Sequence, residues 1–158
     1  MSSRMTIFED ALIAHLKATV TALRTVKPFV GELVDGAGQI VGEPGPAVYC
    51  LASGGDPEKP HDATGDEQCE WALLLCVRNL RSNEEAARGA TGRDGAYDLI
   101  EDLKAALCGA RLPNAQCMPI SVTAWRLYQV TANGPVYQLT LSVLLSAETE
   151  LGSDEGEE

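Results

Sequence analysis

Basic residues are scarce in this sequence. Its 158 residues include 12 lysines and arginines against 23 aspartates and glutamates, for a formal net charge of -11. A nucleic-acid-binding protein needs a basic face to displace counterions from phosphates, so we expect no specific nucleic-acid binding. Long apolar runs are also missing, since none approaches the roughly 18 residues that a membrane span requires. The residues before Thr6 are too few and too polar for a signal peptide, so we expect a soluble protein with no membrane partner.

Recognisable catalytic and metal-binding motifs are absent as well. No Gly-x-x-x-x-Gly-Lys-Ser/Thr loop, Gly-x-Ser-x-Gly elbow or Cys-x-x-Cys pair occurs. The five cysteines are odd in number, and the two histidines stand alone in the sequence. We therefore expect buried, reduced thiols without a disulfide framework, and no catalytic residue, metal or cofactor.

Two alternatives to this expectation stay open. A cysteine and a histidine that are distant in sequence can form a catalytic pair, because such pairs meet only in space. Four acids with helical spacing could bind a hard cation, although a solvated helix face is far more usual: Asp94, Asp98, Glu101 and Asp102.

The chain opens with a predicted helix from about Thr6 to Thr25. Thr6 and Glu9 have the spacing of a capping box, and Lys27-Pro28 is expected to end the helix. The apolar stripe of this helix consists of Phe8, Leu12, Leu16, Val20 and Leu23. His15 lies beside the stripe, so we expect it at the boundary of the core.

Apolar, strand-forming segments follow through the middle of the chain. They predict strands at Phe29–Val34, Ala47–Ala52 and Gln68–Leu80, with an irregular segment at Ser53–Asp66 between the last two. Residues 71–77 are apolar on both faces, which is typical of a central strand that is covered on each side.

The second half of the sequence predicts further helices and a hairpin. A capping box at Ser82 and Glu85 could open a helix through Arg88, and a helical stripe predicts the main second helix at about Asp94 to Cys108. Gly109 is a natural C-terminal cap for this helix. Strands predicted at 120–130 and 137–145 flank an Asn-Gly pair, which is a strong hairpin signal.

This order of elements predicts an α+β fold. We expect a single domain with an antiparallel or mixed four- to five-stranded sheet and two main helices. The periodic apolar faces predict a core of Leu12, Leu16, Val20, Trp71, Leu73, Leu75, Leu103, Leu107, Trp125, Leu139, Leu141 and Val143. The domain is expected to span residues 1–148. Residues 149–158 are acidic and nearly free of apolar groups, so we expect a disordered tail there.

Several of these segments together point to a family. The chain opens its first helix with Met5-Thr6-Ile7-Phe8-Glu9-Asp10-Ala11-Leu12, and later has Pro46-Ala47-Val48-Tyr49 and Trp71-Ala72-Leu73-Leu74-Leu75-Cys76-Val77 as strands. Gly95-Ala96-Tyr97-Asp98-Leu99-Ile100, the most telling segment, opens the second main helix. Over about residues 5–148 the chain resembles a Mu-like bacteriophage family that is encoded among tail genes. It is similar in plan to phage tail terminator, or tail completion, proteins.

The resemblance implies a structural role with no catalytic residues. Terminators of this plan are subunits that close into a hexameric ring on the end of the tail tube. The implied partners are therefore further copies of the chain, the tail tube protein and the head–tail connector. The implied location is the host cytoplasm during assembly and then the virion tail. Two other functions stay open: a monomeric tail-assembly adaptor or chaperone, and an enzyme with a hidden Cys–His or carboxylate site.

Loops that are anchored by a rigid scaffold are the usual places for contact with partners. The segments Asp35–Gly45, Ser53–Asp66 and Thr131–Pro135 have few core-forming residues and lie between predicted strands. We expect the second of them to order on assembly, with a tolerated surface insertion as the alternative. The candidate interface residues are Asp56, Glu58, Lys59, His61, Asp62 and Asn133.

Overall fold

The computed structural model describes residues 3–29, 46–57, 66–77, 83–89, 95–113, 115, 117–131 and 134–146. In this part of the chain a five-stranded sheet has the order β1-β2-β3-β5-β4. The strands are β1 (Thr25–Pro28), β2 (Ala47–Pro57), β3 (Glu67–Cys76), β4 (Ser121–Thr131) and β5 (Gly134–Leu145). The helices are α1 (Arg4–Thr19), α2 (Asn83–Arg88) and α3 (Ala96–Leu107). β1 runs parallel to β2 and the other neighbours are antiparallel, which confirms the predicted α+β class with a mixed sheet.

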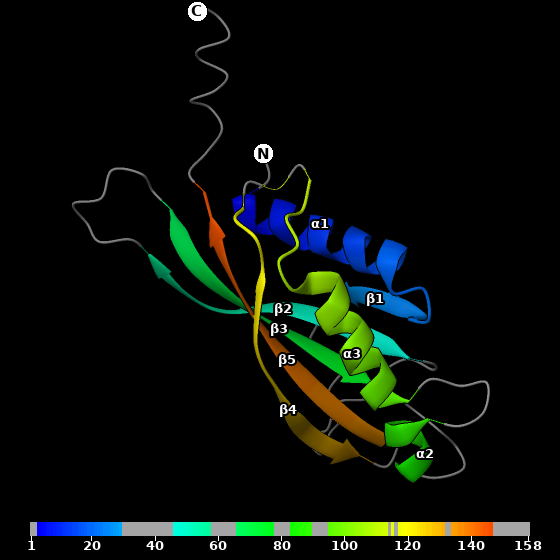
Figure 1. Ribbon diagram of the computed structural model, residues 1–158. Helices are drawn as coiled ribbons and strands as arrows, with labels where there is room; N and C mark the ends of the chain where they lie inside the picture. Colours follow the sequence, from blue (N-terminus) through cyan, green and yellow to red (C-terminus); the bar gives the residue numbers. More distant parts are fainter. Residues whose placement is uncertain are drawn as a thin grey trace, which may run out of the picture.

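The two long helices pack on the same face of the sheet (Figure 1). Beneath them lie alternate side chains of the two central strands, including Leu73 and Leu75 of β3 and Leu139 and Leu141 of β5, all fully buried. α1 contributes Phe8, whose ring centroid lies 4.7 Å from that of Trp71 on β3. This layer of helix and sheet side chains is the main core of the molecule.

The opposite face of the sheet has a second, smaller buried cluster. It consists of Ala47, Tyr49, Leu74, Cys76 and Val136, with Phe29 and Leu51 packed against it. β3 therefore contributes buried side chains to both faces, and its predicted position as a central strand covered on each side is confirmed.

The N-terminal helix starts and ends earlier than predicted. Ser3 is the N-cap, since its Oγ accepts a hydrogen bond from the Thr6 backbone N–H at 3.1 Å. The predicted capping box at Thr6 and Glu9 is therefore wrong, because both residues lie inside α1. Glu9 instead accepts a hydrogen bond from the Trp71 indole N–H, with 3.3 Å between nitrogen and oxygen.

The predicted end of this helix at Thr25 is also wrong. Thr19, Val20 and Thr21 are β-branched in succession and favour extended backbone, and α1 ends at Thr19. Residues 25–28 then form β1, which pairs with β2 and buries Val26. Phe29 lies just past β1 rather than starting a strand, and the rest of the predicted strand at 30–34 lies outside the described residues.

Part of the segment that we predicted to be irregular belongs to the sheet. β2 continues to Pro57 and pairs with β3 as far as Glu67, with a bulge between Ala52 and Gly54. The Ser53 hydroxyl, at the bulge, donates to the backbone carbonyl of Glu70 at 3.1 Å. Glycines in a strand often mark such bulges, but they are also typical of loops. Gly54 and Gly55 therefore led to the wrong prediction of an irregular segment here. Residues 58–65 lie outside the described part.

The second main helix agrees with the prediction to within two residues. α3 runs from Ala96 to Leu107, where Asp94 to Cys108 was expected. The Asp98 carboxylate accepts a hydrogen bond from the Gly95 N–H at 3.1 Å and so stabilises the first turn. Gly109 has a φ of +78°, a left-handed conformation that glycine adopts readily, and confirms the predicted C-terminal cap.

The predicted core is confirmed except at Trp125, whose side chain is 48% exposed. Trp125 lies on β4, at the edge of the sheet, and pairs with Leu139 of β5. Its two-residue spacing from Leu127 matches that of a buried strand face, but the helices do not cover this edge fully. Trp125 is therefore a surface residue.

Truncating central side chains should destabilise the fold strongly. We expect Leu73→Ala and Leu141→Ala each to lower the free energy of unfolding by about 2–5 kcal/mol, because each opens a cavity under the helices. The half-exposed Leu127 is the control, and Leu127→Ala should cost about 1 kcal/mol or less. Denaturant unfolding followed by circular dichroism measures all three, and equal losses for central and edge variants would contradict the described packing.

Candidate assembly surface

The interface residues predicted from the sequence fall almost entirely outside the described part of the chain. Glu58, Lys59, His61, Asp62 and Asn133 lie in segments that the structure does not describe. Asp56 lies in β2, where its backbone pairs with Gln68 of β3. Contact through these residues stays a prediction.

A different surface stands out among the described residues. Eight large apolar side chains are exposed there, and four of them belong to one strand, β4. With Tyr97 of α3 they give the β4 edge an apolar surface that extends over both faces of the strand, and each member is between 45% and 55% exposed. Trp125 and Leu127 pair with Leu139 and Tyr137 on the helix face, whereas Tyr128 lies beside Arg126, which pairs with Gln138 on the other face. We call this surface the β4 patch and define it as Tyr97, Trp125, Leu127, Tyr128 and Val130. In Figure 1, β4 lies below β5, at the lower edge of the sheet.

The buried side chain of Tyr137 on β5 contacts two aromatic rings of the patch. Its ring centroid lies 6.4 Å from that of Tyr97 and 6.2 Å from that of Trp125. Leu127 pairs directly with Tyr137 across the two strands. Burial raises the pKa of the Tyr137 hydroxyl, and the adjacent, hydrogen-bonded Tyr97 raises it further. Tyr137 is therefore a neutral, buried residue against which the exposed rings of Tyr97 and Trp125 pack.

β4 itself contains a single charged residue, Arg126. Its guanidinium carbon lies 6.0 Å from the centroid of the Tyr128 ring, within reach of a cation–π interaction. Bulges interrupt the pairing with β5 between Val122 and Ala124 and again between Leu127 and Gln129. The strand is thus long and irregular, and it exposes four large apolar side chains beside a cation and no carboxylate.

The two edges of the sheet differ in how they meet solvent. Natural sheets protect their edges with short strands, prolines, bulges or charges, because an open edge can pair with another chain. β1, at one edge, has four residues and ends at Pro28. β4, at the other, has 11 residues and pairs only with β5 within the described part of the chain.

Sequence reasoning missed the β4 patch because its signal was ambiguous. The spacing of Trp125 and Leu127, two residues apart, predicts one buried face whether a helix covers the strand or a partner does. The low charge of residues 121–131 was visible in the sequence, but it is also typical of a central strand. Only the position of β4 at the edge of the sheet separates these explanations.

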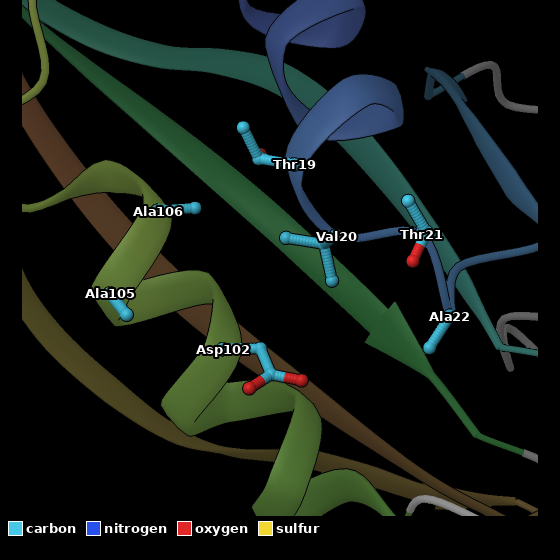
Figure 2. A pocket seen from close by; sticks show the side chains of 7 residues that line it. All are labelled: Thr19, Val20, Thr21, Ala22, Asp102, Ala105 and Ala106. Atoms are coloured by element: carbon cyan, nitrogen blue, oxygen red, sulfur yellow. The ribbon is translucent and has the colours of Figure 1, made fainter.

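A groove of about 420 Å³ lies between the end of α1 and the middle of α3 (Figure 2). Its lining consists of Thr19, Val20, Thr21, Ala22, Asp102, Ala105 and Ala106. Asp102 supplies its only ionisable side chain, so the lining holds no thiol or imidazole for catalysis. The nearby His15 is half-buried at the core boundary, as predicted, with Nε2 2.9 Å from the Ala106 carbonyl oxygen.

The acids of α3 have separate roles and do not converge. Asp98 bonds the N-terminus of the helix, and Glu101 pairs with Lys104 at 3.2 Å. Asp102 lines the groove, and Asp94 lies outside the described residues. In the described ranges no group of three or more histidine, cysteine, aspartate or glutamate side chains could hold a metal ion.

Four of the five cysteines are buried, as predicted, whereas Cys108 is exposed. Burial, with a smaller effect of the Glu9 charge, raises the pKa of the Cys50 thiol to about 12. Burial also raises the pKa of Cys76 to about 11. These thiols stay protonated at neutral pH, so neither is an activated nucleophile.

The raised thiol pKa values predict a loss of stability in alkali. Cys50 and Cys76 bind protons more tightly when folded than at the ordinary pKa of 9.0. Their contribution is complete below pH 9 and is lost as the pH rises through about 11 to 12. We expect a slope on the order of 1 kcal/mol per pH unit for each thiol above pH 9.

Denaturant unfolding between pH 8 and pH 11 measures this slope. Cys50→Ala should flatten it, whereas Cys108→Ala is the matched control and should leave it unchanged, because Cys108 is exposed. A slope that is the same in the wild type and in Cys50→Ala would contradict the assignment.

No helix in the described part of the chain is both long and apolar enough to span a membrane.

Comparison with known proteins identifies the family of this chain. The search of curated proteins found no match. A family model described as Bacteriophage Mu, Gp37 matches residues 4–146, which include all the described helices and strands. The chain therefore belongs to the bacteriophage Mu Gp37 family.

Proposed function

We propose that this protein is a structural subunit of the phage tail, a terminator that caps the tail tube as a ring and joins it to the head-side connector. The observation that carries the proposal is membership of the phage Mu Gp37 family over residues 4–146. The α+β plan, which is similar to that of tail terminators, supports the same role. The proposed site of action is the virion tail, after assembly in the host cytoplasm.

The described chemistry favours a structural role over a catalytic one. The thiols of Cys50 and Cys76 stay protonated at neutral pH, the described acids of α3 have separate roles, and the groove beside α1 has no catalytic pair. The unusual feature is instead an exposed apolar strand edge, which is typical of proteins that bind other proteins. A ring needs a head-to-tail contact between two different surfaces of each subunit.

The charge of the chain suits the proposed position on the DNA path. A net charge of -11 per subunit gives a ring of strongly negative potential. DNA passes through the head–tail junction during ejection, and like charge prevents the polyanion from adhering to the ring. The acidic composition therefore supports a passive conduit and not a DNA-binding protein.

Removal of the gene from the phage tests the proposal. We expect tail tubes of uncontrolled length without attached heads, because nothing then stops tube polymerisation or presents a surface to the connector. Electron microscopy of induced lysates measures tube length, and expression of the wild-type chain in trans should restore normal particles. Tubes of normal length that merely lack heads would contradict the capping function.

A capping assay with purified proteins separates a terminator from a monomeric adaptor or chaperone. The chain should arrest elongation of the tail tube protein at amounts far below one copy per tube subunit, and immunogold label should lie at tube ends. One-to-one binding to the unassembled tube protein, with no effect on finished tube ends, would instead identify a chaperone.

A further inference from the structure

We propose that the next subunit of the ring docks on the β4 patch and covers the outer edge of β4. The inference rests on the proposed ring function, and it names the surface through which one copy of the chain receives another. Three properties of the described residues support a second copy as the occupant: apolar area, the open strand edge and charge.

The apolar area of the patch is large enough for the centre of a stable interface. An aromatic side chain has about 150–250 Å² to bury, and each patch residue is roughly half exposed. Counted over both faces of the β4 edge, Tyr97, Trp125, Leu127, Tyr128 and Val130 together offer on the order of 400 Å² of apolar surface. That is about half of the ~800 Å² that each partner buries in a standard stable interface. Aromatic side chains of this kind are also common at the energetic centre of interfaces.

The edge of β4 offers backbone groups beside this apolar surface. β4 pairs with β5 along one side only within the described residues, so its outer side can receive a further strand. The bulge near Tyr128 limits the regular part of that edge to the segment around Trp125. A partner that follows the strand there would cover both the backbone edge and the exposed rings.

Charge favours this surface for contact between identical copies. Two chains of net charge -11 repel each other, so they meet most easily where negative charge is absent. β4 has no carboxylate, and its single charge is the cation Arg126. A second acidic copy therefore finds at β4 an apolar surface with a positive charge beside it.

The contact must be head-to-tail to build a ring. Two β4 edges that paired with each other would form a closed dimer and leave no β4 edge for a third copy. The patch is therefore expected to meet a different surface of the neighbouring subunit. β1, the other edge of the described sheet, is too short and too close to a proline to provide the same long pairing.

Matched charge-insertion variants test the proposal. Leu127→Lys places a charge in the centre of the patch, and Ile7→Lys, on an exposed apolar residue of α1, is the control. Sedimentation velocity at micromolar concentration, with and without tail tubes, measures the ring. We expect Leu127→Lys to weaken ring assembly by roughly 30-fold or more, as at an interface hot spot, and Ile7→Lys to assemble normally. Thermal unfolding of both monomers should show that the fold is kept.

A photo-crosslinking amino acid gives a second measurement that does not depend on weakened assembly. Placed at Tyr128, it should crosslink one copy of the chain to another within the ring, whereas the same group at Ile7 should not. Added salt should strengthen assembly, because it screens the repulsion between acidic copies while leaving apolar contact intact.

The outcomes separate this inference from the proposed function. A Leu127→Lys variant that forms normal rings, or a Tyr128 crosslink to the tail tube protein, overturns the β4 interface and leaves the terminator function standing. A wild-type chain that stays monomeric with and without tail tubes overturns both. Crosslinked rings in the wild type and monomers in Leu127→Lys support both.

Discussion

Packing of α1 and α3 on the central strand pair is the interaction on which the rest of the structure depends. Alternate side chains of β3 and β5 lie fully buried beneath the two helices, with Phe8 against Trp71 at the centre. β3 is buried on its other face as well, so it is fixed from both sides. Several polar contacts orient α1 on this core. Among them, Glu9 accepts from the Trp71 indole, and Arg4 donates to the Ser146 carbonyl at 2.9 Å.

The same packing explains why the edge of the sheet is open. β5 receives the helices directly, whereas β4 extends beyond their cover and keeps its large apolar side chains half exposed. Tyr97, at the start of α3, is the only large apolar residue of that helix that is exposed, and it leans toward Tyr137 and the β4 side. The core thus positions an apolar surface that the described part of the chain does not bury. The proposed ring requires such a surface, since a ring is stabilised by contacts that the monomer leaves unmade.

Much of the fold could be predicted from the sequence because its periodic patterns were strong. The stripe of α3 and the alternation of β5 each specify one element, and the asparagine–glycine pair specifies the hairpin that joins β4 to β5. Local ambiguity caused the errors. Val20 fits the helical stripe of α1, yet it lies among β-branched residues and follows the helix end. Gly54 and Gly55 suggested a loop, but pairing with β3 keeps them in a strand.

The candidate surface could not be predicted in the same way. Trp125 and Leu127 have the pattern of core residues, and only tertiary position distinguishes a strand that a helix covers from one that awaits a partner. The family resemblance, in contrast, depended on whole segments, and the match over residues 4–146 confirms a Mu-like phage family. Apart from Asp56 in β2, the residues first proposed for contact lie outside the described part, so they neither support nor weaken the β4 interface.

The most direct test of the account is an electron cryomicroscopy reconstruction of the tail end with this protein bound. We expect a closed ring at one end of the tube, in which β4 of each subunit lies against the neighbouring subunit and Trp125 is buried. Copies spaced along the tube, or a terminal ring in which β4 faces solvent, would contradict it.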